Sequence, residues 1–160
     1  MSALCSKEDR VIIRKLEDRD LAQVSSVCLN SFMKSVAPSL SDVGISTFQK
    51  ISSVDSFTAR LKENIDILVC EENEKIQGII ELKDGRHISM LFVSPEHQKQ
   101  GVGRSLLLSI MSFTTSDTIT VSASLTSVNA YLSFGFVLSG GISEASGLRF
   151  QPMKLELNKG

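Results

Sequence analysis

The stretch Phe92-Val-Ser-Pro-Glu-His-Gln-Lys-Gln-Gly-Val-Gly-Arg104 decides the fold, because an apolar strand ends in it and an amphipathic helix begins in it. Pro95 stops the strand, and the apolar spacing predicts a helix over 102–113. Gly101 and Gly103 let the backbone approach a ligand closely. Free N–H groups at a helix start then point into one space. The stretch predicts an anion-binding loop suited to a diphosphate, or else a loop that simply requires glycine.

Two common nucleotide-binding motifs do not fit this stretch. A dinucleotide fold needs three glycines near the N-terminal strand of a βαβ unit, whereas two glycines occur here, deep in the chain. A P-loop needs Gly-Lys-Ser or Gly-Lys-Thr, and neither is present. Lys99 and Arg104 can add positive charge at the rim of the loop.

The residues before the loop predict a strand, three helices and a meander of three strands. The first strand is 11–15, and helices are predicted over about 21–33 and 44–51. A third helix is predicted to start behind Ser53 or Asp55 and to run to about residue 63. Apolar runs at 67–70, 76–82 and 87–93 are joined by short polar turns, of which Asp84-Gly85 is a strong two-residue hairpin signal. Consecutive strands with tight turns predict antiparallel pairing.

The residues after the loop complete one sheet. A strand over 119–123 precedes a short helix over 128–134 that ends at Gly135, and closing strands follow at 136–138 and 148–157. The stretch between those last two strands, 139–147, is predicted as a loop. We expect one α/β domain over 1–160, with a single mixed, largely antiparallel twisted sheet and helices on both of its faces.

Composition excludes several classes of protein. The chain is 42% hydrophobic and 22% charged, and its formal net charge of -1 offers no overall basic field for nucleic acid or an acidic membrane. We find neither a signal peptide nor a run of apolar residues long enough to span a membrane, so we expect a cytoplasmic protein. Cys5, Cys28 and Cys70 are too widely spaced for a disulfide framework or a metal cluster, which predicts structural roles and no metal.

Two separated motifs resemble the GNAT superfamily of N-acetyltransferases. Gln98-Lys-Gln-Gly-Val-Gly103 is similar to the family signature Gln/Arg-x-x-Gly-x-Gly/Ala, after an apolar strand that ends near a proline. Tyr131 stands four residues before Gly135-Phe136, as a tyrosine often does in the family. The order of elements agrees along nearly the whole chain, and 147–153 resembles a subgroup of uncharacterised bacterial members. The resemblance implies transfer of an acetyl group from acetyl-CoA to a primary amine, by direct attack in a ternary complex.

The resemblance also implies where acetyl-CoA binds. The strand before Pro95 would pair with the pantetheine arm, the loop would hold the pyrophosphate, and two neighbouring strands would splay apart to admit the thioester. Many relatives carry an asparagine where this chain has Ser122 or Ser124, a contact for which Asn129 can compensate unless it only caps the helix. The cofactor residues implied in this way are Leu91, Phe92, Val93, Gln98, Lys99, Gln100, Gly101, Val102, Gly103, Arg104, Ser105, Ser122, Asn129 and Tyr131.

The chemistry needs an acid, a base and an oxyanion donor. Tyr131 resembles the family's general acid, which protonates the departing thiolate, although a core tyrosine would look the same. A lysine-type amine has a pKa of about 10.4 and must lose a proton. His87 stands where some members have a glutamate base, Glu81 is a second candidate, and a water relay is the third. A strand N–H near Phe92 or Val93 would polarise the thioester carbonyl.

The acceptor is an amine-bearing small molecule or a protein amine. In the family the first helices, here about 21–51, wall the acceptor site, and they contain Phe32, Met33, Phe48 and Asp42. Family members often dimerise, so a homodimer is one expected assembly. Two other interpretations stay open: a catalytically inactive module that binds acetyl-CoA as a sensor or docks to a partner, and an unrelated α/β structural protein.

Overall fold

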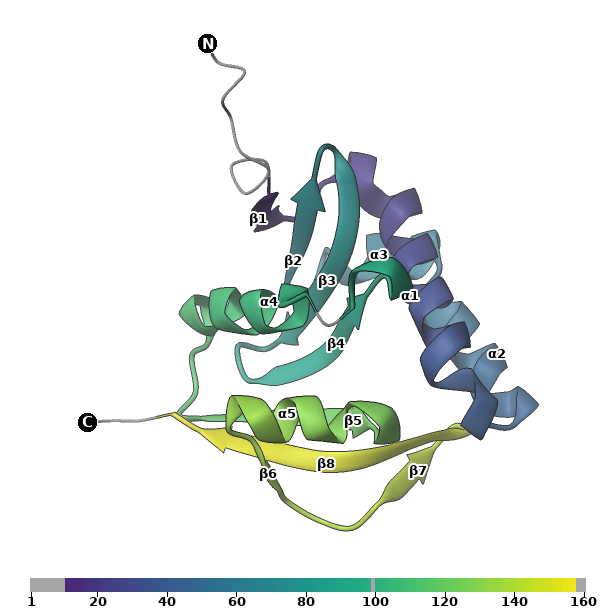
Figure 1. The fold of residues 1–160 in the computed structure, drawn as a ribbon, viewed down its shortest axis with the longest axis vertical. Helices are drawn as coiled ribbons and strands as arrows, with labels where there is room; N and C mark the ends of the chain where they lie inside the picture. The colour runs from purple at the N-terminus through teal and green to yellow at the C-terminus, as the bar shows by residue number, and fades with distance from the viewer. Residues whose placement is uncertain (1–10, 99, 158–160) are drawn as a thin grey trace.

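The computed structural model describes residues 11–98 and 100–157, and the eight strands in this part of the chain pair in one sheet (Figure 1). The strands are β1 (Val11–Lys15), β2 (Ile65–Glu72), β3 (Lys75–Lys83), β4 (His87–Val93), β5 (Thr118–Ser124), β6 (Val137–Leu138), β7 (Ser143–Ala145) and β8 (Leu148–Glu156). Their order in the sheet is β1-β2-β3-β4-β5-β8-β6, and β7 pairs with β8. Every pair is antiparallel except β4 with β5. The predicted mixed, largely antiparallel sheet is therefore confirmed.

Helices cover both faces of this sheet, as expected (Figure 1). The helices are α1 (Leu21–Ser35), α2 (Asp42–Ile51), α3 (Val54–Arg60), α4 (Val102–Ile110) and α5 (Val128–Phe134). The first three pack on one face, and α4 and α5 pack on the other. The predicted helix over 102–113 ends as an α-helix at Ile110 and continues as a 3-10 turn over Met111–Phe113.

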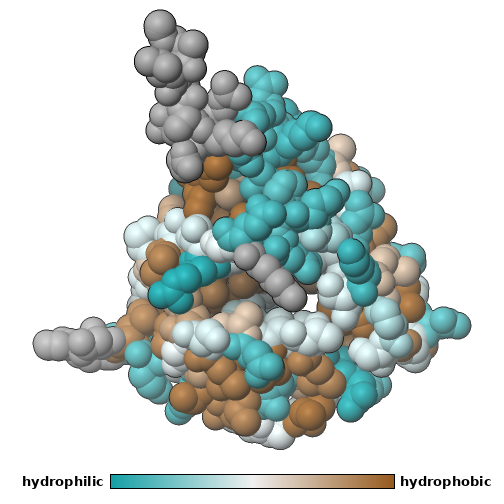
Figure 2. Space-filling view, in the orientation of Figure 1, coloured by the Kyte–Doolittle hydropathy of each residue, from teal (hydrophilic) through white to brown (hydrophobic). Residues whose placement is uncertain are grey.

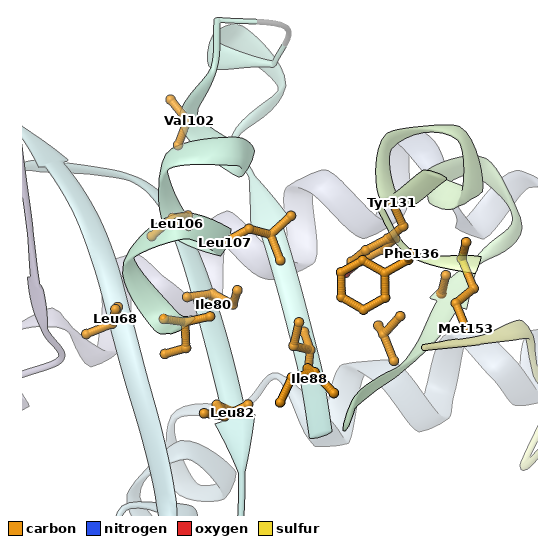
Figure 3. Close-up of a cluster of buried hydrophobic side chains, with 14 of the residues drawn as sticks. Leu68, Ile80, Leu82, Ile88, Val102, Leu106, Leu107, Tyr131, Phe136 and Met153 are labelled. Carbon is orange, nitrogen blue, oxygen red and sulfur yellow. The ribbon is translucent and has the colours of Figure 1, made fainter. Parts of the chain in front are cut away.

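Successive side chains of a strand point to opposite faces of the sheet, so the hydrophobic core has two layers, one on each face. On β2, Ile67 and Val69 face the layer under α1–α3, while Leu68 and Cys70 face the layer under α4 and α5. Figure 3 shows this second layer, in which the rings of Tyr131 and Phe136 meet between α5 and the sheet; their centroids are 5.2 Å apart. Burial on both faces explains why the middle of β2, Ile67 to Cys70, is an unbroken apolar run.

The pairing of β4 with β5 is short, and it positions the site. The two parallel strands pair only at His87↔Thr120 and Ile88↔Val121, and beyond these residues no pairing joins them. On the other side of β4, the register to β3 shifts across Ser89, which is the extra residue of a β-bulge. A bulge bends its strand and increases the local twist. The sheet consequently opens between the C-terminal halves of β4 and β5.

The predicted loop over 139–147 contains a strand that the sequence analysis missed. β7 pairs with β8 through a turn at Ser146-Gly147, where Gly147 has φ +81°. This turn lies directly on α2, because a Cβ on Gly44 would stand 2.2 Å from the Gly147 carbonyl oxygen. The Thr47 hydroxyl donates to the Ser146 carbonyl at 2.7 Å. Few apolar residues alternate in β7, so this strand depends on its tertiary partner.

Figure 2 shows the face that bears α4 and α5. Hydrophobic side chains gather there over α5 and β6, where Leu132, Val137 and Leu138 are exposed, whereas hydrophilic side chains gather around the turn between β2 and β3. Among the described helices, none combines the length and the apolar character that a membrane span requires.

Candidate active site

The opening between β4 and β5 separates two pockets that meet at Tyr131. The α4–α5 pocket, of about 510 Å³, lies on the face of the sheet that carries those helices. The α1–α2 pocket, of about 200 Å³, lies mainly on the opposite face. Both are lined by the same six residues at the opening: Val36, Leu91, Phe92, Ser124, Ser127 and Tyr131. A molecule in one pocket can therefore reach a molecule in the other through the gap in the sheet.

The start of α4 makes the α4–α5 pocket suitable for an anion. Gly101 precedes the helix with φ +86°, and the first amide that bonds within the helix is that of Ser105, at 3.0 Å from the Gly101 carbonyl. The amides of 102–104 donate to no described residue. The Arg104 guanidinium lies 5.3 Å from the centre of the Phe134 ring, and none of the described residues that line the pocket is a carboxylate. Free amides beside a guanidinium, without an anion among the described lining residues, fit a diphosphate.

The exposed edge of β4 offers further backbone donors. The Ser94 amide donates to the Gln77 carbonyl at 2.7 Å, and alternate residues of an antiparallel pair exchange such bonds. The amides of Phe92 and Met90 therefore point toward β3, and those of Leu91 and Val93 point toward the gap. Of the two residues expected near the oxyanion, this register favours Val93. The Gln98 side chain caps the same edge by donating from Nε2 to the Val93 carbonyl at 3.1 Å.

Tyr131 lies on α5 at the junction of the pockets. The residue is 4% exposed, and its hydroxyl has no hydrogen-bond partner among the described residues. Burial raises the pKa of the phenol above its ordinary value. The group therefore stays protonated near neutral pH and can donate a proton or a hydrogen bond into either pocket.

Glu81 lies behind the wall of the α1–α2 pocket, in a polar cluster with Arg60 and Ser89. Its carboxylate is 2% exposed, accepts from Arg60 Nε at 3.1 Å and accepts from the Ser89 hydroxyl at 2.8 Å. Ser89 is the bulged residue of β4 and itself lines the pocket. Arg60 is held in turn by the Ile51 carbonyl at 3.0 Å and stacks over the Phe57 ring at 4.5 Å. The hydrogen bond from the Ser89 hydroxyl therefore connects Glu81 to the pocket.

His87 lies at the opposite, paired end of β4. Its Nδ1 is 2.7 Å from the Thr120 hydroxyl, and the residue lines neither of the two pockets. Burial, followed by the charges of Lys83 and Arg86, lowers the pKa of the imidazole. The structure therefore does not bring His87 together with Tyr131, and the expectation that it is the base finds no geometric support.

The residues expected at the cofactor site separate into four groups. Ser122 lines the α1–α2 pocket only. Gln100, Val102, Ser105 and Asn129 line neither of the two pockets: Val102 is buried against Gly78 in the core, and Asn129 is exposed on α5. Lys99 lies outside the described residues. The residues that do line the α4–α5 pocket are Leu91, Phe92, Val93, Gln98, Gly101, Gly103, Arg104 and Tyr131.

Several serines also line the α4–α5 pocket. Ser124, which the sequence analysis named beside Ser122, is one of them, and its hydroxyl donates to the Ser127 hydroxyl at 2.9 Å. The sequence analysis missed the others. Ser31 and Ser35 reach the pocket from α1, and Ser31 lies 3.4 Å from the Gln98 amide. Serines on the polar side of a helix carry no pattern that distinguishes them from solvent-facing ones. Only packing against β4 identifies them.

The first helices wall the α1–α2 pocket, as expected. Phe32 and Phe48 line it and stack with ring centroids 4.0 Å apart, whereas Met33 and Asp42 do not line it. Cys28 and Cys70 are buried, burial raises the pKa of both thiols, and neither lines the two pockets. Cys5 lies outside the described residues. Within the described residues, no three His, Cys, Asp or Glu side chains form a group able to hold a metal ion.

Solved structures share this architecture. The chain has a TM-score of 0.79 and 22% identity to a GCN5-related N-acetyltransferase from Rhodopseudomonas palustris, over 91% of this chain and 95% of that one. The chain has a TM-score of 0.75 and 20% identity to the PaiA N-acetyltransferase of Thermoplasma acidophilum, solved in complex with coenzyme A, over 91% of this chain and 98% of that one. It has a TM-score of 0.65 and 22% identity to YncA of Salmonella typhimurium, a putative acetyltransferase solved with acetyl-CoA, over 94% of this chain and 96% of that one. These identities establish the fold alone.

The match to a family model goes further than the fold. No curated protein sequence matches the chain. The model described as an acetyltransferase (GNAT) domain, however, matches residues 36–157, which include β2 to β8, the loop before α4 and Tyr131. The chain therefore belongs to the GNAT acetyltransferase family.

Proposed function

We propose that this protein is an N-acetyltransferase, which moves the acetyl group of acetyl-CoA onto a primary amine. The observation that carries the proposal is the Tyr131 hydroxyl, which is free of any described partner at the junction of two pockets. One pocket has the anion-binding features of α4, and the other is small and largely apolar. Acetyl-CoA in the first and an amine in the second would meet at the gap between β4 and β5.

The residues of the α4–α5 pocket would hold acetyl-CoA. The amides of 102–104 and the Arg104 guanidinium would bind the diphosphate, and the free edge of β4 at Leu91 and Val93 would pair with the amides of the pantetheine arm. Bound there, acetyl-CoA supplies an activated thioester. The Val93 or Leu91 amide would donate to the carbonyl oxygen as negative charge develops on it.

The transfer forms an N–C bond and breaks a C–S bond. Tyr131 would give its proton to the departing sulfur, which leaves as a thiol. The proton of the attacking amine would pass to the Ser89 oxygen while the Ser89 hydroxyl proton passes to Glu81 Oε2, 2.8 Å away. Arg60 would stabilise the ionised form of Glu81 before transfer. The ionised glutamate thus has a path to the pocket, although it is itself buried.

Direct attack in a ternary complex is the simplest order of events. Neither cysteine in the described part of the chain lines the two pockets, so neither is positioned to carry the acetyl group as a covalent intermediate. Initial rates measured against both substrates should therefore give intersecting lines in a double-reciprocal plot. Parallel lines would contradict direct attack and point to an acetylated enzyme.

The first experiment is a calorimetric titration with acetyl-CoA, followed by a screen of primary amines that detects free thiol. Micromolar binding with amine-dependent thiol release would support the proposal. Binding without turnover by any amine would favour the inactive acetyl-CoA-binding module. The absence of binding would overturn both interpretations.

A further inference from the structure

The α1–α2 pocket has an apolar interior suited to a small hydrocarbon skeleton. Phe32 and Phe48 stack with an interplanar angle of 6°, and Phe92 packs edge-on to Phe48 at 5.2 Å. Met90 and Ile51 complete this wall. The volume of about 200 Å³ is smaller than that of a drug-sized site and suits a metabolite of the size of an amino acid.

Among the described residues, Arg149 is the only charged one that lines this pocket. It is exposed, and it forms no ion pair with a described residue; Glu144, its neighbour in the β7–β8 register, does not lie within ion-pair distance. Glu81, which lies behind the wall and bonds the lining residue Ser89, is buried and already paired with Arg60. Within the described part of the chain, the pocket consequently has a free cation and no free carboxylate. This charge pattern disfavours an acceptor that carries a second ammonium group and favours one that carries an anion.

The backbone around Arg149 is held firmly against α2. The Thr47 hydroxyl binds the Ser146 carbonyl at 2.7 Å, and the close approach of Gly44 to Gly147 brings the β7–β8 turn onto the helix. Leu148 and Phe150, on either side of Arg149, also line the pocket. A cation carried on an anchored strand loses less conformational entropy when it binds a ligand than one on a free loop.

We propose that the acceptor is an amino acid with an apolar or aromatic side chain and a free carboxylate, and that Arg149 determines this specificity by binding the carboxylate. The inference rests on the proposed N-acetyltransferase function. The apolar side chain would fill the space beside Phe32, Phe48 and Met90. The carboxylate would form charge-assisted hydrogen bonds with the guanidinium, and the amine would remain free to face Ser89 and the gap.

The test compares two product analogues in calorimetric titrations against the protein with CoA present. N-acetyl-L-phenylalanine carries the carboxylate, and N-acetylphenethylamine is the same skeleton without it. The wild-type protein should bind the carboxylate compound at least about 10-fold more tightly, and Arg149→Gln should remove that difference. Arg149→Lys should restore part of it. Arg86→Gln, which changes an exposed arginine on the turn before β4, is the matched control and should behave as the wild type.

Equal affinity for the two compounds in the wild type, or an equal loss of both in Arg149→Gln, would overturn the role of Arg149. Turnover is measured separately with L-phenylalanine and phenethylamine as acceptors. Carboxylate-dependent binding without acetyl transfer to these acceptors or to any amine of the screen would refute the proposed enzyme activity and leave the carboxylate site standing. Transfer to phenethylamine that equals or exceeds transfer to phenylalanine would refute the carboxylate site and leave the activity standing.

Discussion

The two ends of the β4–β5 pair differ sharply although they belong to the same two strands. At the paired end, His87 bonds Thr120, and the backbones are joined in parallel register. At the open end, Leu91, Val93 and Ser124 line a pocket, and the Tyr131 hydroxyl has no described partner. The paired end satisfies its polar groups internally, whereas the open end leaves donors for a ligand. Chemistry should therefore be confined to the open end.

The largest expected effect comes from a negative charge at the open end. Gly103 is not in the left-handed region, and a Cβ there would meet only the Val93 side chain at 3.7 Å, so the fold accommodates a side chain. Gly103→Glu should raise the Kd for acetyl-CoA by about 100-fold or more, through repulsion of the diphosphate. Gly103→Gln, of the same shape, should weaken binding much less. Calorimetric titration measures the Kd of both variants for acetyl-CoA. Equal Kd values would exclude binding of the pyrophosphate at this loop.

Removal of the phenol oxygen should slow the chemical step. Tyr131→Phe should lower kcat by about 100-fold and change the KM for acetyl-CoA by less than about 3-fold, because the proton donor is lost while the ring remains packed on Phe136. Steady-state thiol release measures both constants. Because burial raises the phenol pKa, the wild-type rate should show no decline from Tyr131 ionisation up to about pH 10. An unchanged kcat in the variant would exclude Tyr131 as the acid.

Loss of the proposed proton path should have an intermediate effect. Ser89→Ala should lower kcat by about 10-fold, while Ser89→Thr, which keeps the hydroxyl, should retain most of the activity. Thermal unfolding serves as the control, since Arg60 continues to satisfy Glu81 in both variants. Equal rates for Ser89→Ala and the wild type would favour a water relay instead.

The smallest effect on catalysis belongs to the paired end. His87→Gln should change kcat by less than about 3-fold, because the residue lines neither of the two pockets. A loss of kcat comparable to that of Tyr131→Phe would show that chemistry is not confined to the open end, and it would restore His87 as the base.

The same variant should change how stability depends on pH. Burial and the charges of Lys83 and Arg86 lower the folded-state pKa of His87, so the unfolded chain binds its proton more readily. The wild type should therefore lose stability relative to His87→Gln as pH falls from about 6.5 toward the lowered pKa, and the difference between the two proteins should stop changing above about pH 7.5. Chemical denaturation at several pH values measures this trend. A difference that is independent of pH would contradict it.

Much of the fold could be predicted because local signals agree with it. The apolar alternation and turns of 65–93 encode the meander, and Gly135 ends α5 with φ +122° as expected. β7 escaped prediction because Ser143, Glu144 and Ala145 carry no strand pattern and pair only where α2 anchors their turn. Helix α4 ends early because its last turn tightens into a 3-10 turn.

For the site, the sequence by itself determined those elements whose geometry depends only on residues close together in the chain. The glycine loop before α4, the strand that leads into it, and Tyr131 four residues before a helix-ending glycine are all properties of neighbouring residues. Backbone amides at a helix start need no distant partner, so a motif is enough to reveal them.

Only the tertiary structure decided which side chains meet across the sheet. The sequence placed His87 before Glu81 as the candidate base. In the structure, however, the bulged residue Ser89 lines the pocket and donates its hydroxyl to Glu81, while the β4–β5 pairing closes the end that holds His87. Arg149 and Phe32 lie more than a hundred residues apart and line one pocket. Such contacts depend on strand register and on the packing of helices, which no local pattern encodes.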